Sequence, residues 1–100
     1  MATITKTFKA PINQDNGDTH HFIGHADCRM TLFASTLFGQ IKWFYKFIDG
    51  KHRGIEEVRT IDLWFDRNHR LIDFSGVHEL PVEAIELLED NGYNTEYAKT

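Results

Sequence analysis

The sequence predicts an α+β fold: an antiparallel meander of about five strands with one C-terminal helix packed on one sheet face. Three observations predict it. Up to about residue 75, apolar and polar residues alternate over long segments, as the two faces of a strand require. Stretches rich in Asn, Asp and Gly separate these segments and are typical of turns. Beyond Gly76 the apolar spacing becomes helical, which predicts a single helix near the end of the chain.

The clearest strand is predicted for residues 41–48. Its odd positions form an apolar and aromatic row, Ile41, Trp43, Tyr45 and Phe47, and its even positions a mixed row, Lys42, Phe44, Lys46 and Ile48. A helix would place the lysines and the aromatic rings all round its surface, so the alternation favours a strand. We therefore expect the odd row to face the core and the even row to be half exposed.

Two strands are expected before this one. Residues 3–12 alternate threonines with mostly apolar side chains, and Pro11, which has no backbone N–H to donate, indicates an edge strand. A turn is expected at 13–18, where Asn and Gly tolerate positive φ. Pairing Ile12 with Phe22 across this turn brings the apolar rows of both strands to one face.

Even positions from residue 20 to residue 38 are nearly all apolar or small, which predicts a long second strand. A strand of this length is expected to bend, near Gly24 or around 34–36. A short helical turn over 34–38 is the alternative. Gly39–Gln40 then fits a two-residue hairpin turn of type II′, with Gly first, and this turn keeps the apolar rows on one face.

Two further strands and two turns complete the predicted sheet. Residues 49–54 are expected to form a longer, basic turn, followed by a strand over 55–66. Asn68–His69 is expected to be a tight turn in which Asn takes positive φ. The facing residues are then Phe65 with Ile72 and Leu63 with Phe74 in the core row, and Trp64 with Asp73 on the opposite face.

The helix is bounded by two residues with opposite preferences. Pro81 fits the first turn of a helix, where its missing N–H costs nothing. Gly92 is expected as the left-handed residue after the helix, with Tyr93 folding back on Leu88 in a Schellman arrangement. The apolar residues at helical spacing between these limits are Val82, Ala84, Ile85, Leu87 and Leu88.

Length and composition restrict the class of protein. One hundred residues make one domain, which we assign to residues 1–93, followed by a loose tail over 94–100. The net charge of −4 argues against a generally basic nucleic-acid binder. Cys28 is the only cysteine, which excludes an internal disulfide and fits a reducing compartment. No signal-peptide pattern and no apolar run of about 20 residues occur, so we expect a cytoplasmic protein without a membrane partner.

The predicted helix is too short to cover a whole sheet face. Roughly ten residues extend ~15 Å at 1.5 Å per residue, whereas five strands spaced by ~4.8 Å are wider. The sheet must therefore curl round the helix, or another chain must supply cover. The opposite face also carries large apolar side chains, namely Phe33, Leu37, Phe44, Ile48, Trp64 and Leu71.

This opposite face is the predicted interaction surface, because apolar patches mixed with charges are typical of protein interfaces. The candidate residues are Lys42, Phe44, Lys46, Asp62, Trp64, Asp66 and Asp73. We expect Phe44 and Trp64 to anchor a protein partner or a second copy in a homodimer. The hypothesis is a small non-enzymatic interaction protein, accessory or inhibitory in role. The alternative structural role of these side chains is packing against loops or a strongly coiled sheet.

A zinc site built from the histidines near residue 20, with Asp27 and Cys28, is disfavoured by its spacing. On a strand His20 and His21 point to opposite faces. His21 and His25 lie ~13 Å apart at 3.3 Å per residue, too far for two ligands that must each lie about 2 Å from one ion. We expect neither a metal nor a cofactor.

Two other functions are weaker hypotheses. The acidic and histidine side chains that could form a paired acid/base site are Asp62, Asp66, Asp73, His78 and Glu79. Nothing in the sequence brings them to one pocket, so ion pairs with the lysines are the preferred role. A pocket between sheet and helix, for a small ligand or for catalysis, is the second functional hypothesis. Single-stranded nucleic-acid binding on residues 42–46 is the third, and the net charge argues against it.

Overall fold

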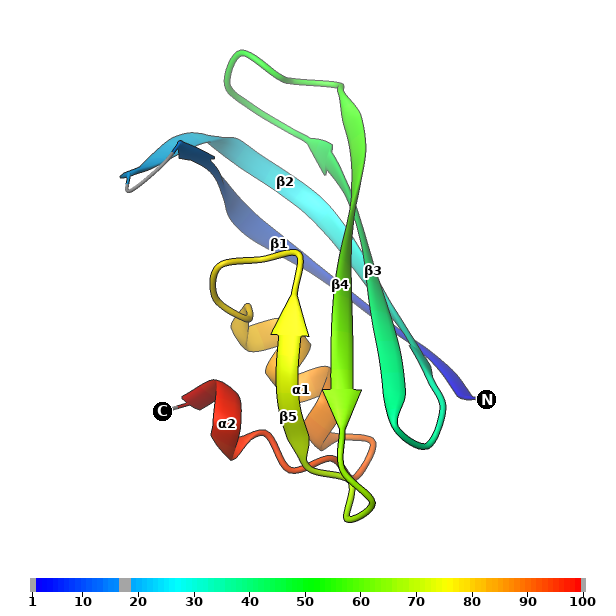
Figure 1. Cartoon of the computed structure of the whole chain (residues 1–100). Coiled ribbons are helices and arrows are strands. Elements are labelled where there is room, and N and C mark those ends of the chain that lie inside the picture. Colours follow the sequence, from blue (N-terminus) through cyan, green and yellow to red (C-terminus); the bar gives the residue numbers. More distant parts are fainter. Residues whose placement is uncertain (1, 17–18, 100) are drawn as a thin grey trace.

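The computed structural model of the chain describes the backbone at residues 2–16 and 19–99 and the side chains at 5–13 and 22–99. Within these residues it contains a five-stranded antiparallel sheet in the order β1-β2-β3-β4-β5 and two helices (Figure 1). The elements are β1 (Ala2–Asn16), β2 (Thr19–Ala34), β3 (Phe38–Phe47), β4 (Glu56–Phe65), β5 (Leu71–Ser75), α1 (Val82–Glu89) and α2 (Glu96–Lys99). The predicted fold class, a meander of five strands with a C-terminal helix, is confirmed.

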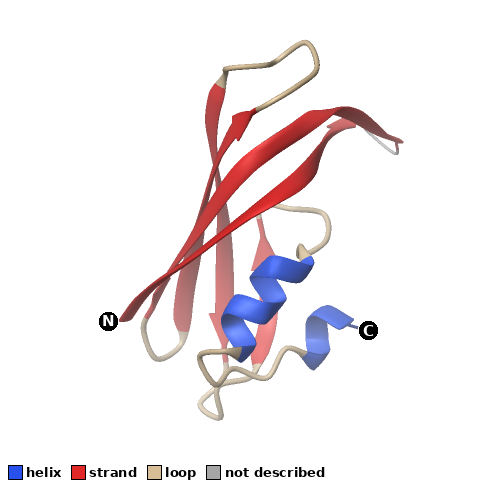
Figure 2. Cartoon of the chain, turned by 180° about the vertical axis from the view of Figure 1, so that it is seen from behind, coloured by secondary structure: helices blue, strands red, loops and turns tan. Residues whose placement is uncertain are grey.

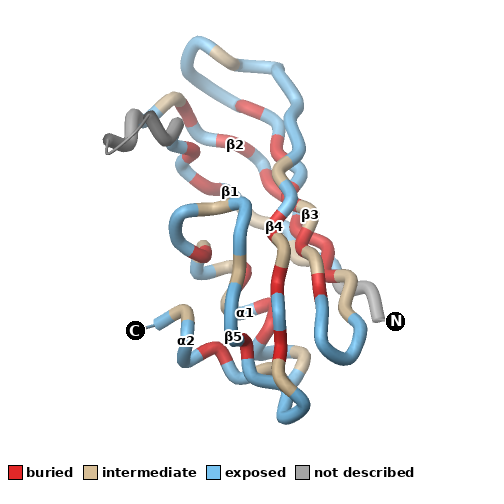
Figure 3. The backbone as a smooth tube through the Cα atoms, in the orientation of Figure 1, coloured by how far each residue is buried: buried red, intermediate tan, exposed pale blue. Residues whose placement is uncertain are grey.

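The two helices in the described residues lie against one face of the sheet, which we call the inner face; the opposite side is the outer face (Figure 2). The inner side chains of β3 are buried as predicted, since Trp43 and Tyr45 expose only 7% and 5% of their surface. Buried and exposed residues alternate along β3 and along the second half of β4 (Figure 3). Lys6, which interrupts the apolar row of β1, forms an ion pair with Glu86 of α1.

Helix α1 has the predicted ends. Its first residue follows Pro81, and Gly92 takes a φ of 84° beyond its last turn. The Tyr93 N–H donates to the Leu88 carbonyl at 3.1 Å and the Gly92 N–H to the Glu89 carbonyl at 3.0 Å, which is the Schellman pattern. The ring of Tyr93 stacks on Phe65, with centroids 4.3 Å apart, and so ties the end of α1 to β4.

The register between β1 and β2 differs from the prediction by two residues. Ile12 faces Gly24 and not Phe22, although the shift is even and the predicted inner rows still share a face. The reason is an irregularity between Ile12 and Asn13, beyond which the pairing runs one residue out of step to the hairpin end. Phe22, predicted in the inner row, pairs with Asn13 instead and is 57% exposed. The predicted edge position of the first strand is confirmed.

The predicted turn at Gly39–Gln40 is wrong. Both residues lie inside β3, the strands are joined by residues 35–37, and residues 34–38 are not helical either. The apolar rows of the two strands again share a face, because Leu32 faces Ile41 in this register. The prediction that Phe38 faces Ile41 in the core is wrong: Phe38 faces Trp64 and is 44% exposed, because the turn comes before it. Gly39 has a packing role: a Cβ there would lie 2.8 Å from the ring of Phe65.

The hairpin between β4 and β5 is partly as predicted. The pairs Leu63 with Phe74 and Trp64 with Asp73 are confirmed. An irregularity then brings Leu71, and not Ile72, opposite Phe65. As a result Leu71 is buried in the core, whereas Ile72, predicted to be inside, is 49% exposed. Positive φ occurs at His69 (59°) and not at Asn68.

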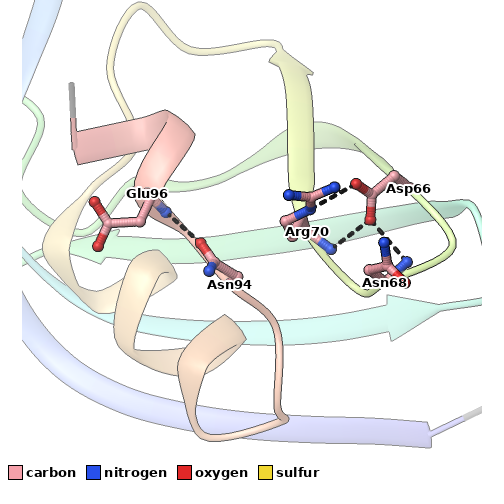
Figure 4. Close-up of polar contacts among 5 residues, drawn as sticks. All are labelled: Asp66, Asn68, Arg70, Asn94 and Glu96. Atoms are coloured by element: carbon pink, nitrogen blue, oxygen red, sulfur yellow. Dashed lines mark hydrogen bonds and ion pairs between the residues drawn. The ribbon is translucent and has the colours of Figure 1, made fainter.

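Residues 94–99 are more ordered than the loose tail that the sequence predicted. They contain α2, which lies beside β5, and the Thr95 side chain is 98% buried. The Thr95 hydroxyl donates to the Glu89 carboxylate at 3.0 Å, and Lys99 pairs with the same carboxylate at 2.7 Å. Asn94 accepts the backbone N–H of Glu96 (Figure 4). The contacts of Thr95 and Lys99 to Glu89 of α1 were not visible in the apolar spacing used for the prediction.

No helix in the described part of the chain has the length and apolar character needed to cross a bilayer.

Candidate functional site

The outer face is covered by neither of the helices in the described residues (Figure 2). It carries exposed aromatic side chains. Phe44 and Trp64 are 36% and 37% exposed. Trp64 forms an edge-to-face pair with Phe38, its neighbour across the strands, with centroids 5.8 Å apart. Phe44 faces Val58 across the strands. We call these four residues, Phe38, Phe44, Val58 and Trp64, the outer patch.

Charged side chains separate the two halves of the outer patch. Lys42 and Lys46 flank Phe44 on β3. On β4, Asp62 accepts a hydrogen bond from Gln40 Nε2 at 3.0 Å, and Glu56 lies opposite Lys46. The outer face therefore has its lysines on β3 and acidic residues on the neighbouring strand. This arrangement matches the mixed charge predicted for this surface.

Asp66 and Asp73 are engaged locally. The Asp66 carboxylate accepts the backbone N–H of Asn68 at 2.8 Å, that of Arg70 at 3.0 Å, and Arg70 Nε at 2.8 Å (Figure 4). These donors, the Arg70 backbone N–H first, lower the pKa of Asp66 below its ordinary value. Asp73 Oδ1 accepts the N–H of Phe74 at 2.8 Å. Asp66 thus holds the turn between β4 and β5, and its oxygens have little capacity left for a partner.

The other apolar residues predicted on the outer face have different positions. Leu37 and Ile48 are exposed next to the ends of β3, and Phe33 is half-buried on β2. Leu71 belongs to the core, so its assignment to the outer face is wrong. The irregularity before Phe65 is the physical reason, because it brings Leu71 to the inner face and leaves Ile72 exposed.

The residues considered for metal binding do not converge in the part of the chain whose side chains are described. No group of three or more His, Cys, Asp or Glu side chains there is placed to hold an ion, while the side chains of His20 and His21 lie outside it. His25 contacts Asp49, with Nδ1 2.7 Å from Oδ2. Cys28 is buried, and burial raises the pKa of its thiol. A buried, protonated thiol is a poor nucleophile.

The aromatic residues of the segment 42–46 are divided between the two faces. Trp43 and Tyr45 lie in the inner core, and Phe44 lies on the outer face with the lysines. A row of neighbouring exposed rings on which successive bases would stack is therefore not formed by this segment. The carboxylates considered for a paired acid/base site are separated as well. Asp62, Asp66 and Asp73 each accept a hydrogen bond from a different donor, on the outer face or in the turn between β4 and β5.

The inner face contains an open hollow of about 1140 Å³ beyond the first turn of α1. Its floor is formed by Trp43 and Tyr45, whose ring centroids are 5.6 Å apart. The surrounding lining residues are Pro11, Asn13, Ile23, His52, Glu57, Arg59, Gly76, Val77, His78, Glu79, Leu80, Pro81 and Val82. The two long hairpins, β1–β2 and β3–β4, extend beyond the helices on this side of the molecule (Figure 1).

Glu57 and Arg59 are the residues of this hollow that sequence reasoning missed. The Arg59 guanidinium lies over Trp43 and Tyr45, 5.6 and 6.0 Å from their ring centroids. The Tyr45 hydroxyl donates to Glu57 Oε2 at 2.9 Å; burial first, and then this carboxylate, raise the pKa of Tyr45. The available signal was position: both residues continue the inner row of β4 that begins at Ile61. Charges in a core row indicate that the core ends there.

No family model matches this chain, and neither a curated protein nor a solved structure matches it.

Proposed function

We propose that the protein is a non-enzymatic interaction protein that self-associates into a two-fold symmetric dimer through its outer face. The observation that carries the proposal is the exposure of Phe44 and Trp64 on a sheet face that neither of the described helices covers. Sheets commonly bury such a face against a second sheet. Aromatic anchors surrounded by charges are also the usual composition of interface hot spots.

The register of β3 and β4 supports a second copy as the occupant. A two-fold axis parallel to the strands and midway between them lays β3 of one copy over β4 of the other, and a symmetric interface must be self-complementary in this way. Each cross-strand pair then meets its own counterpart. The facing residues are Phe38 with Trp64, Phe44 with Val58, and Lys46 with Glu56 of the second copy.

The charges agree with this arrangement. Lys42 lies opposite Thr60 across the strands, one step along the same face from Asp62. In the dimer, Lys42 of one copy therefore lies near Asp62 of the other, and apolar and charged rows each meet a compatible row. Asp73 lies level with Trp64 at the edge of the face, and we assign it to the rim; Asp66 remains with its turn.

Light scattering of the purified chain tests the proposal. We expect a mass twice the 11.7 kDa of one chain. Trp64→Ala is expected to give a folded monomer, because one hot-spot aromatic contributes about 2 kcal/mol and the symmetric dimer loses two of them, or roughly a thousandfold in affinity. Tyr97→Ala, which shortens an exposed aromatic residue on α2, is the matched control and should remain dimeric.

A charge exchange distinguishes the proposed geometry from unspecific association. Lys42→Asp should weaken the dimer by repulsion of Asp62 in the second copy, and adding Asp62→Lys should restore it. A wild-type chain that stays monomeric up to millimolar concentration would contradict self-association and direct the search to a different protein partner. A Trp64→Ala chain that unfolds would show that Trp64 is core.

The proposal includes no catalytic step, metal or cofactor. The one cysteine is unpaired and buried, which is compatible with a reducing compartment, and we therefore propose the cytoplasm as the location.

A further inference from the structure

The inner hollow lies on the opposite side of the sheet from the outer patch, and its floor is built rigidly. Four aromatic rings of the inner face follow one another, with centroid distances of 6.5 Å from Phe8 to Trp43 and 5.6 Å from Tyr45 to Phe47. Trp43 and Tyr45 are almost fully buried by their neighbours. Nε1 of Trp43 has no hydrogen-bond partner among the described residues.

The position of the β3–β4 hairpin, which forms one wall of the hollow, is fixed by contacts to β2. The Ile48 N–H donates to the His25 carbonyl at 2.9 Å, and the His25 N–H donates to Asp49 Oδ1 at 2.6 Å. Gly50, with a φ of 74°, approaches the backbone so closely that a Cβ would lie 2.5 Å from the Ile23 carbonyl oxygen. The hollow is therefore formed before any ligand arrives, as is usual for small-molecule sites.

Arg59 gives the hollow a specific chemical character. Its guanidinium is half-buried over the two floor rings, and no carboxylate among the described residues lies within ion-pair distance of it. The nearest acidic neighbour along the strand, Glu57, is instead engaged by the Tyr45 hydroxyl. A guanidinium stacked on aromatic rings keeps its N–H edge for planar anions such as carboxylates.

The rest of the lining restricts the ligand. Apolar walls are supplied by Pro11, Ile23, Val77, Pro81 and Val82. The other titratable groups that face the hollow are His52, Glu57, His78 and Glu79. Two carboxylates would repel a ligand with several negative charges, so a single negative charge fits best.

We propose that this hollow binds a small amphipathic monoanion, with its apolar body against the apolar walls and its carboxylate or sulfonate group at Arg59. The site is independent of the proposed dimer, because its lining lies on the inner face. No residue of the outer patch takes part.

A pair of fluorescent probes tests the inference on the full chain. The probe 8-anilinonaphthalene-1-sulfonate has a flat apolar body and one negative charge, and N-phenyl-1-naphthylamine is the same ring system without the charge. We expect saturable binding of the sulfonate to the folded protein. Arg59→Gln should weaken it about tenfold or more, as the loss of a charge-assisted hydrogen bond predicts, and should leave the uncharged probe nearly unaffected.

The control is Arg53→Gln, which removes the same charge from an exposed position in the loop between β3 and β4. It should leave the sulfonate affinity unchanged. An equal loss for both probes in Arg59→Gln would mean that the floor had collapsed and would overturn the role of Arg59. Unchanged sulfonate binding in that variant, or no saturable binding at all, would overturn the site.

The chain has two tryptophans, which provide a second readout of position. In a ¹⁵N–¹H spectrum, assigned with Trp64→Phe, the indole signal of Trp43 should shift when the sulfonate probe is added while that of Trp64 stays. A shift confined to Trp64 would place the probe on the outer patch and would contradict the inference.

Discussion

The two faces of strand β3 consist of similar residues but meet different surroundings. On the inner face Trp43 and Tyr45 are buried among other side chains, including Phe8 of β1 and Arg59 of β4, and on the outer face Phe44 is 36% exposed between two lysines. All three side chains are large and aromatic, so hydrophobicity alone does not explain the difference. The side chains that pack around each residue explain it. Apolar residues on the outer face are therefore those whose role is least accounted for by folding of the monomer.

The largest expected effect comes from two neighbours in β4 that point in opposite directions. Leu63 is fully buried, and Leu63→Ala should lower the free energy of unfolding by about 3–4 kcal/mol, as for other core truncations. Trp64→Ala should cost the monomer only about 1 kcal/mol, the contribution of its cross-strand pair with Phe38. Urea unfolding at a concentration where the chain is monomeric measures both values. Equal losses would show that both faces serve as core.

An intermediate effect is expected at Gly39, where the inner packing leaves no room for a methyl group. Gly39→Ala should destabilise the fold by about 1–3 kcal/mol, because the new Cβ would press on the Phe65 ring. A double-mutant cycle with Phe65→Leu, followed by urea unfolding, separates this clash from a general loss of strand flexibility. The shorter side chain should relieve part of the cost. If the two losses simply add, the clash is not the cause.

The smallest effect concerns Asp66, which fixes the turn where Leu71 enters the core and Ile72 faces outward. Its pKa is lowered in the folded chain, so the unfolded state binds more protons in acid. The stabilisation is complete above the ordinary pKa of 3.8 and is lost as the pH falls through the lower folded value. Melting curves from pH 7 to pH 2 should show Asp66→Asn less stable than wild type at pH 7 and nearly equal to it at pH 2. A constant difference would mean that the carboxylate charge is not involved.

Much of the fold was predictable because the alternation of inward- and outward-facing side chains along a strand is a local property of the sequence. The alternation in residues 41–48 places each side chain on the correct face, and Pro81 and Gly92 bound the helix correctly. The register errors at Gly39–Gln40 and at Ile12 were even numbers of residues, so most residues of these strands kept their predicted face. Three residues predicted to face the core are exposed instead, namely Phe22, Phe38 and Ile72. Phe22 follows the irregularity after Ile12, Phe38 follows the misplaced turn, and Ile72 lies at the irregularity before Phe65. No pattern in the sequence announces these irregularities.

The candidate sites were less accessible to sequence reasoning. The exposure of Phe44 and Trp64 follows from the alternation of side chains between the two sheet faces, once the helix is assigned to one face. The hollow does not, since it depends on how β1, β3 and the segment before α1 approach one another in space. Gly39 shows the same limit. A glycine at this position suggests a turn, but it is there to make room for the ring of Phe65, which lies 26 residues away in the chain.

The length of α1 has a consequence for the whole molecule. Its eight residues extend about 12 Å at 1.5 Å per residue, while the chain measures 43 Å along its longest axis. Pro81 prevents the helix from starting a turn earlier, and Gly92 stops it from continuing. Pro81 borders the hollow, so the residue that sets the start of the helix also sets where the helical cover of the inner face gives way to that open space.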